Sequence, residues 1–131
     1  MRFLLDTVVW LWSVGEVARL NLATRDVLTD PGNDLYFSAA SVWEIAIKTS
    51  IGKMNLKGPP SVVVPRETQR QGLRPLQVTY SHALAVHDLP LLHGDPFDRL
   101  LVAQAQCEDL ILITADREIR RYKVEILWAG R

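Results

Sequence analysis

Four residues able to do chemistry occur together just before an apolar helix. They are His93, Asp95, Asp98 and Arg99, with Pro96 among them. Asp95 is a suitable N-cap, Pro96 suits the first helical position, and the carboxylate of Asp98 is favoured in the first turn by the helix dipole. These features alone explain a well-capped helix. A catalytic function requires that carboxylates from elsewhere in the chain converge on Asp98.

Three other acidic residues lie close to the ends of predicted strands or the starts of predicted helices. They are Asp6, Glu44 and Asp116. Crowded carboxylates repel one another and lose hydration, so folded proteins tolerate them mainly where a cation lies among them. Oxygen ligands select hard divalent ions such as Mg²⁺ or Mn²⁺, which also bind phosphate oxygens. This pattern predicts hydrolysis of a phosphodiester by in-line attack of a water held by the metal.

The elements that must position these acids are short apolar segments alternating with helical ones. Strands are predicted over residues 3–5, 35–37, 73–78, 110–113 and 124–127. One helix is predicted to begin at residue 8, and another to begin between residues 38 and 41 and to end at residue 50. Further helices are predicted over residues 20–28, 61–71, 79–87 and 96–108. The alternation predicts one domain, residues 1–131, of the α/β class. We expect a three-layer α/β/α arrangement around a mainly parallel sheet of about five short strands.

Strand ends and helix starts meet at one edge of a parallel sheet. Asp6, Glu44 and Asp116 are therefore expected to come together there. Asp98 does not follow from this rule, because its helix leads into a strand rather than out of one. We include it because the long connection 89–95 could deliver it to the same edge.

The composition is that of a globular protein without an overall positive field. Among 131 residues, 48% are hydrophobic and 23% are charged, and 15 basic residues balance 15 acidic ones. A net charge of zero excludes recruitment of nucleic acid by the whole surface. Such contact would depend on a metal ion or on a local basic cluster, here Arg117, Arg120, Arg121 and Lys123.

The single cysteine, Cys107, excludes an internal disulfide and a cysteine-rich zinc site. We expect it to be buried on its apolar helix and inert. One cysteine fits a reducing cytoplasm, and no apolar run approaches the roughly 20 residues needed to cross a bilayer. The expectation is a cytoplasmic protein without membrane contact.

Four short motifs follow one another along the chain: Leu4-Leu5-Asp6-Thr7, Ser41-Val42-Trp43-Glu44-Ile45-Ala46-Ile47-Lys48, Asp95-Pro96-Phe97-Asp98-Arg99 and Ile113-Thr114-Ala115-Asp116. In this order and spacing, the chain resembles the PIN-domain ribonucleases over essentially its whole length. More narrowly, it resembles the VapC toxins of toxin–antitoxin pairs. The resemblance implies a PIN-like fold and a metal-dependent endoribonuclease that acts as the toxin of a type II toxin–antitoxin system.

The resemblance also implies roles for single residues and partners. Asp6, Asp98 and Asp116 would be ligands of Mg²⁺ or Mn²⁺, and Glu44 would bind the metal directly or orient the water. The implied partners are an RNA substrate, a VapB-like antitoxin that covers the site, and a second copy of the chain in a homodimer. Val8 departs from the pattern, because close relatives often have a polar residue there.

The helix that contains Glu44 allows simpler explanations. Ser41 and Glu44 have the spacing of a capping box. Lys48 lies one turn beyond Glu44, where it either forms an ion pair with that carboxylate or approaches RNA. The apolar periodicity predicts a core face made of Val42, Ile45, Ala46 and Thr49.

Several other polar residues have two explanations. Arg99 and Arg117 are candidate phosphate contacts or solvated charges. His93 either contacts phosphate or orients Asp95. His82 and His87 are five residues apart and do not share a helical face, so both are expected on the surface or in loops.

Two other functions are compatible with the class of fold. A signalling receiver domain also has an acidic Mg²⁺ pocket, but it needs an acid at the end of a central strand, and the predicted strand 73–78 ends without one. A catalytically inactive PIN-like binding module is disfavoured by the presence of all four acids. The tryptophans Trp10, Trp12 and Trp43 are expected in the core or a dimer interface rather than as base-stacking platforms.

Overall fold

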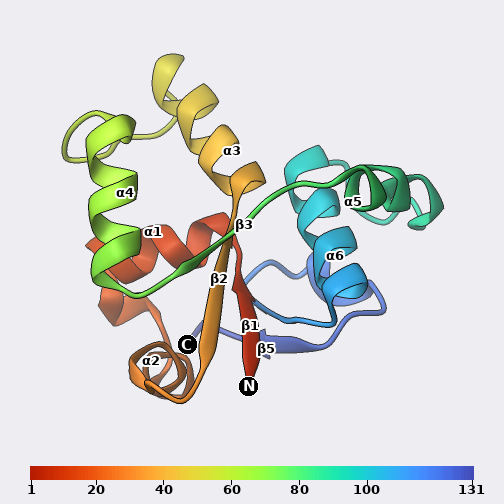
Figure 1. The fold of residues 1–131 in the computed structure, drawn as a ribbon, viewed down its shortest axis with the longest axis horizontal. Helices are drawn as coiled ribbons and strands as arrows, with labels where there is room; N and C mark the ends of the chain where they lie inside the picture. Colours follow the sequence, from red (N-terminus) through yellow and green to blue (C-terminus); the bar gives the residue numbers. More distant parts are fainter.

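A fully parallel, five-stranded sheet forms the centre of the computed structural model, which describes residues 1–131 (Figure 1). Its strands, in the spatial order β3-β2-β1-β4-β5, are β1 (Arg2–Leu5), β2 (Asp34–Ser38), β3 (Arg74–Leu76), β4 (Ile111–Thr114) and β5 (Ile126–Trp128). The central strand is β1, and its Leu5 pairs with Phe37 on one side and Ile113 on the other. The residue after β1, Asp6, therefore lies in the middle of the carboxyl edge.

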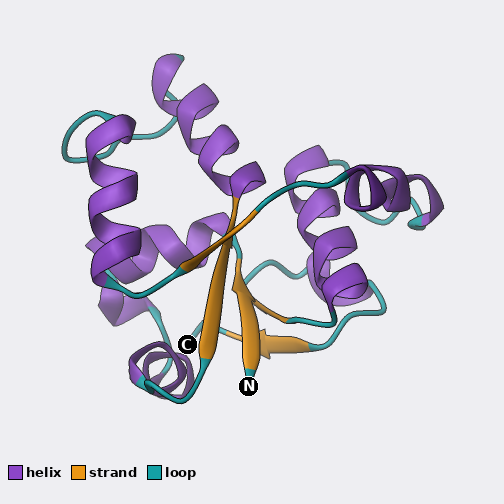
Figure 2. Cartoon of the chain, viewed as in Figure 1, coloured by secondary structure: helices purple, strands orange, loops and turns teal.

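Helices cover both faces of the sheet. They are α1 (Thr7–Gly15), α2 (Leu22–Thr29), α3 (Ala39–Ser50), α4 (Pro60–Arg70), α5 (Tyr80–Ala85) and α6 (Pro96–Glu108). In Figures 1 and 2, α1, α2 and α4 lie on one side of the sheet and α5 and α6 on the other, while α3 extends beyond its carboxyl edge. This arrangement confirms the predicted three-layer α/β/α fold. None of the helices combines the length and apolar character needed to span a membrane.

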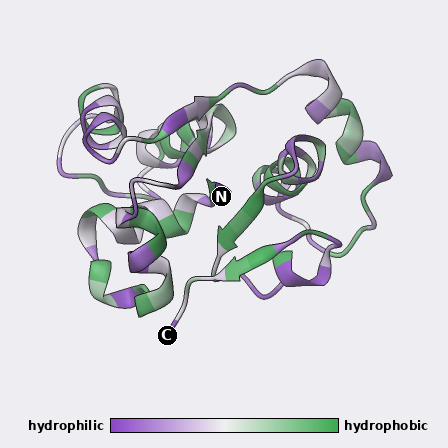
Figure 3. Ribbon diagram, turned by 60° about the horizontal axis from the view of Figure 1, so that its bottom comes forward, coloured by the Kyte–Doolittle hydropathy of each residue, from purple (hydrophilic) through white to green (hydrophobic).

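The two faces of the sheet bury two separate cores. On β1, Phe3 and Leu5 face the layer of α1 and α2, where Trp10 stacks on Phe37 with ring centroids 5.0 Å apart. Leu4 points the other way and packs against α6. Green strand segments accordingly stand out in Figure 3, whereas the edge strand β3 contains Arg74 and Pro75 and is largely exposed. The central strands are apolar and are packed on both faces. Their carboxyl ends, next to which the acids lie, are therefore fixed in position and direction.

Helix α3 begins at Ala39, within the predicted range, but its cap and its buried face differ from the prediction. Its N-cap is Ser38, whose hydroxyl accepts from the backbone N–H of Ala40 (3.0 Å). The predicted capping box of Ser41 and Glu44 is therefore wrong, because both residues lie inside the helix on its buried face. The predicted core face is only partly right: Ile45 is buried, whereas Val42 and Ala46 are exposed.

Two predictions about burial were also wrong. His82 is 1% exposed. Its Nδ1 accepts from the backbone N–H of Thr79 (3.1 Å), and its Nε2 lies 2.9 Å from Glu108 Oε2, so it caps α5 and ties it to α6. Cys107, expected to be buried, is exposed near the end of α6. His87 lies on the surface as expected.

Candidate functional site

An open cleft of about 510 Å³ lies at the carboxyl edge of the sheet. All four predicted acids line it, each from a different element: Asp6 after β1, Glu44 on α3, Asp98 in the first turn of α6 and Asp116 after β4. The other residues that line the cleft are Thr7, Val8, Trp12, Lys48, Asp95, Ala115 and Arg117. The structure thus brings Asp98 to the same edge as the other three.

Asp6 is fixed by two hydrogen bonds at the start of α1. Its Oδ1 accepts from the backbone N–H of Val9 (2.7 Å), and its Oδ2 accepts from the Thr114 hydroxyl (2.5 Å). The residue is only 3% exposed. Burial raises the pKa of Asp6 to about 6, against the lowering effect of both hydrogen bonds, and the charges of Asp116 and Glu44 raise it further. The carboxylate is therefore held in a fixed orientation, and burial and its acidic neighbours favour its protonated form.

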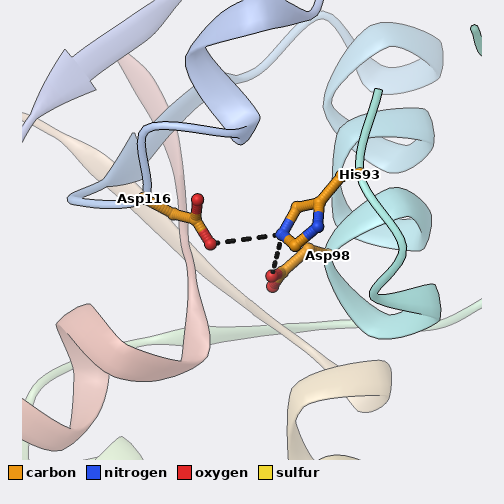
Figure 4. A group of neighbouring side chains, drawn as sticks. All are labelled: His93, Asp98 and Asp116. Carbon is orange, nitrogen blue, oxygen red and sulfur yellow. Dashed lines mark hydrogen bonds and ion pairs between the residues drawn. The ribbon is translucent and has the colours of Figure 1, made fainter. Parts of the chain in front are cut away.

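His93 bridges two of the acids, as Figure 4 shows. Its Nε2 lies 2.9 Å from Asp98 Oδ2 and 3.2 Å from Asp116 Oδ2. Its Nδ1 accepts from the backbone N–H of Asp95 (3.3 Å), so Nε2 is the nitrogen that donates to the two carboxylates. His93 thus contacts Asp95, as one explanation held. Its bridge between the acids was not predicted, because it depends on how the connection 89–95 folds back.

Burial and neighbouring charges both shift the pKa values of this group. Burial raises the pKa of Asp98 to about 7, and the charges of Asp95 and three other carboxylates add to the effect. Burial alone would lower the pKa of His93, but its hydrogen bond with Asp116 and the charges of Asp98 and Asp116 outweigh burial and raise it. Burial and the crowding of carboxylates thus both favour the protonated form of Asp98.

The donor set fits a divalent cation. A carboxylate oxygen of Asp98 and one of Asp116 lie within 4.8 Å of each other and are bridged by His93 Nε2, and the carboxylate of Asp6 lines the same cleft. Carboxylate oxygens are the ligands that Mg²⁺ and Mn²⁺ prefer. A bound ion would offset the repulsion that the raised pKa values of Asp6 and Asp98 reveal.

Glu44 lines the cleft from α3 and is held there by two side chains. Its Oε1 accepts from the Thr7 hydroxyl (2.6 Å), which lies 2.9 Å from the hydroxyl of Ser41. Its Oε2 accepts from Lys48 Nζ (2.5 Å), which confirms the predicted ion pair one helical turn apart. This hydrogen bond raises the pKa of Lys48. Both Glu44 oxygens are thus oriented, and the ammonium group of Lys48 lies at the cleft.

Arg99 does not reach the cleft, because the next residue on a helix after Asp98 points about 100° away. Its guanidinium donates to the carbonyls of Pro90 (2.9 Å) and Val86 (3.2 Å) and to the hydroxyl of Tyr122 (3.0 Å). The same hydroxyl accepts from the backbone N–H of His93 (2.9 Å). The expected phosphate contact of Arg99 is therefore not supported. Arg99 and Tyr122 instead clamp the connection that delivers His93.

The tryptophans divide among three environments. Trp10 is fully buried in the core, as expected. Trp12 lines the cleft, with the guanidinium of Arg19 5.4 Å from its ring centroid. Trp43 is 61% exposed and meets Phe97 edge to face at 5.3 Å, so it does not belong to the core.

The fold and this acidic site define a class of protein. The chain belongs to the PIN-domain family, whose sequence model matches residues 3–125. Within that class it is similar to the ribonuclease VapC16 of Mycobacterium tuberculosis, at 41% identity over 59 residues. The aligned stretch covers 45% of this chain and 42% of that protein, so less than half of the relative's length is matched.

Solved structures support the same assignment of fold. The chain is similar to VapBC2 from Rickettsia felis, with a TM-score of 0.74, 16% identity and coverage of 98% of this chain and 99% of that one. It is also similar to VapBC from Salmonella typhimurium, with a TM-score of 0.71, 15% identity and 97% coverage of both chains. The family predicted from the four sequence motifs is thus confirmed.

Proposed function

We propose that the chain is a metal-dependent endoribonuclease, active with Mg²⁺ or Mn²⁺, that acts as the toxin of a type II toxin–antitoxin pair. The main support is the convergence of Asp6, Glu44, Asp98 and Asp116 on one cleft. Membership of the PIN-domain family and the sequence similarity to a VapC ribonuclease agree with this reading.

In this proposal Asp6, Asp98 and Asp116 hold the metal. When bound, the metal supplies Lewis-acid stabilisation of charge on the phosphate and lowers the pKa of the attacking water. The carboxylates must be unprotonated for this, and His93 must release its bonds to Asp98 and Asp116. His93 keeps its place after that release, because its backbone N–H still donates to the Tyr122 hydroxyl.

The chain's own residues then divide the remaining work. Glu44 lines the same cleft from α3, where its oriented carboxylate binds the metal or orients the attacking water. Thr7 and Lys48 keep that carboxylate in place. Lys48 and Arg117 line the cleft and offer positive charge to the phosphate of the substrate.

The proposal includes a protein partner and a second copy of the chain. The structures of similar fold are VapBC complexes, which supports a VapB-like antitoxin as the partner. A reducing cytoplasmic setting agrees with the single cysteine. We expect that expression of the chain alone arrests growth and that co-expression of the antitoxin relieves the arrest. Normal growth under strong expression of the folded chain would contradict the role as a toxin.

Cleavage of RNA by the purified protein tests the activity directly. We expect cleavage with Mg²⁺ or Mn²⁺ and none with EDTA. Asp98→Asn should remain folded and lose at least about 100-fold in rate, because a metal ligand matters at least as much as the groups that orient ligands.

The matched control is Asp109→Asn, at the other end of α6. Asp109 has a left-handed backbone (φ 57°), which asparagine also adopts readily, so this variant should cleave like the parent. Cleavage that persists in EDTA, or in Asp98→Asn, would show that the site is wrongly assigned. A folded parent that binds RNA without cleaving it would favour the inactive binding module.

A further inference from the structure

The acidic cleft poses a charge problem for an RNA substrate, if the proposed function is correct. Five carboxylates line it against two cationic side chains, Lys48 and Arg117, and Lys48 is already paired with Glu44. A metal ion offsets charge only at its own position. The neighbouring phosphates of a polyanion therefore need positive groups on the rim.

Arg120 offers such a group on the side of β5. Its guanidinium carbon lies 4.6 Å from the centroid of the Trp128 ring, and the side chain makes no hydrogen bond or ion pair with the protein. Arg121, beside it, is committed to Glu118 Oε2 (2.8 Å) and the carbonyl of Leu92 (3.2 Å). A guanidinium seated on an indole is positioned by the ring while its N–H donors stay free.

The Arg120–Trp128 pair lies at the same edge of the sheet as the acids. Trp128 pairs in parallel register with Thr114, whose hydroxyl binds Asp6. A Cβ placed on Gly130 would lie 3.3 Å from Trp128 Nε1 and 3.6 Å from the Cβ of Ala115, a residue that lines the cleft. Gly130 thus lets the indole pack close to the cleft wall.

Arg117 connects this pair to the cleft. It lines the cleft itself and precedes Arg120 by three residues, which span at most about 10 Å of chain. Arg117 at the cleft and Arg120 on Trp128 are thus two neighbouring arginines without acidic partners, and Arg120 is the one farther along the chain from Asp116. We propose that Arg120, seated on Trp128, binds an RNA phosphate adjacent to the one cleaved, and that the substrate leaves the cleft over Arg117 toward β5.

The chain contains a matched control for this contact. The guanidinium of Arg2 lies 5.4 Å from the ring centroid of Tyr36, which is a similar arginine–aromatic pair, and its Nη1 also donates to the carbonyl of Glu108 (2.9 Å). Arg2 begins β1, at the amino end of the sheet and away from the cleft. Arg120→Gln and Arg2→Gln each remove one positive charge that lies against an aromatic ring. Only Arg120→Gln should weaken the binding of RNA.

Binding is measured with the Asp98→Asn protein, which does not consume the substrate, by fluorescence anisotropy of single-stranded RNA at about 50 to 200 mM salt. Adding Arg120→Gln should weaken binding several-fold and reduce the slope of log affinity against log salt by about 0.7, the loss of one phosphate contact. Adding Arg2→Gln should leave both unchanged. In the active parent, Arg120→Gln should raise KM with little change in kcat.

The outcomes separate this inference from the function on which it rests. If the parent cleaves RNA and Arg120→Gln behaves like Arg2→Gln in both salt slope and KM, the phosphate contact is refuted while the nuclease stands. If the parent neither cleaves nor binds RNA, the proposed function fails, and this contact fails with it. Arg120→Lys should retain most of the salt slope, because it keeps the charge.

Discussion

His93 occupies, at the scale of single residues, the place between two carboxylates that a cation would otherwise hold. Its Nε2 donates to Asp98 and Asp116, while Nδ1 is taken by the backbone of Asp95. A nitrogen that donates to the ligands does not present a lone pair to a metal. His93 therefore stabilises the metal-free cleft and competes with the ion.

This role predicts the effect of His93→Ala. The metal-free variant should lose about 1–2 kcal/mol in free energy of unfolding, because two hydrogen bonds to charged groups disappear. Its affinity for Mn²⁺ should stay equal or rise, since the competing donor is gone. Urea denaturation in EDTA and calorimetric titration with Mn²⁺ measure the two effects.

His87→Ala is the control, because His87 is exposed and remote from the cleft acids. It should change neither quantity. A several-fold weaker affinity for Mn²⁺ in His93→Ala would instead identify His93 as a metal ligand.

The connection before α6 matters most at the scale of elements, because the sheet alone does not bring Asp98 and His93 to the cleft. Tyr122 is 5% exposed, and its hydroxyl accepts from both Arg99 and the backbone of His93. Tyr122→Phe keeps the ring and removes this shared acceptor. We expect a loss of about 1–3 kcal/mol in stability, because the backbone N–H of His93 loses its partner and Arg99 loses one of its acceptors.

The same change should lower kcat more than it raises KM, since His93 and Asp98 are displaced rather than a substrate contact removed. Urea denaturation and steady-state cleavage test both expectations. Tyr80→Phe is the comparison, because Tyr80 is 90% exposed and its hydroxyl makes no hydrogen bond within the protein. Normal cleavage by a folded Tyr122→Phe protein would rule out the positioning role.

Local signals explain which elements could be predicted from the sequence. Helix α6 begins at Pro96 after the cap Asp95, as predicted, because both signals are adjacent in the chain. The start of α3 was predicted only to within a few residues and its cap was wrongly assigned to Ser41, since Ser38 and Ser41 are both suitable caps and only packing decides between them. His82 was misjudged because its burial results from partners on α6 that are distant in sequence.

The parallel sheet explains, at the scale of the whole molecule, how far the site could be predicted. The topological rule for strand ends was sufficient to bring Asp6, Glu44 and Asp116 together. The rule says nothing about long connections, so Asp98 was placed by inference and the bridge through His93 was missed. A net charge of zero likewise conceals a cleft of carboxylates beside a rim of unpaired arginines.

The buried, crowded acids of the cleft also affect how the stability of the metal-free protein depends on pH. They make the folded protein less stable as pH rises. The folded state raises the pKa of Asp6 to about 6, that of Asp98 to about 7, and that of His93 above its ordinary value. All three groups hold protons more tightly in the folded than in the unfolded chain. Proton release then opposes folding, so the free energy of unfolding should fall as pH rises from about 5 to about 8.

Divalent metal should reverse this trend, because it binds the carboxylates that have lost their protons. In EDTA, we expect the parent to be more stable at pH 5.5 than at pH 8, by on the order of a few kcal/mol. Mn²⁺ should stabilise it at pH 8 far more than at pH 5.5.

Asp98→Asn removes one repelling charge, so at pH 8 in EDTA it should be more stable than the parent, whereas Asp109→Asn should match the parent. Chemical denaturation at the two pH values measures each difference, and greater stability of the metal-free parent at pH 8 would contradict the charge excess inferred for the cleft.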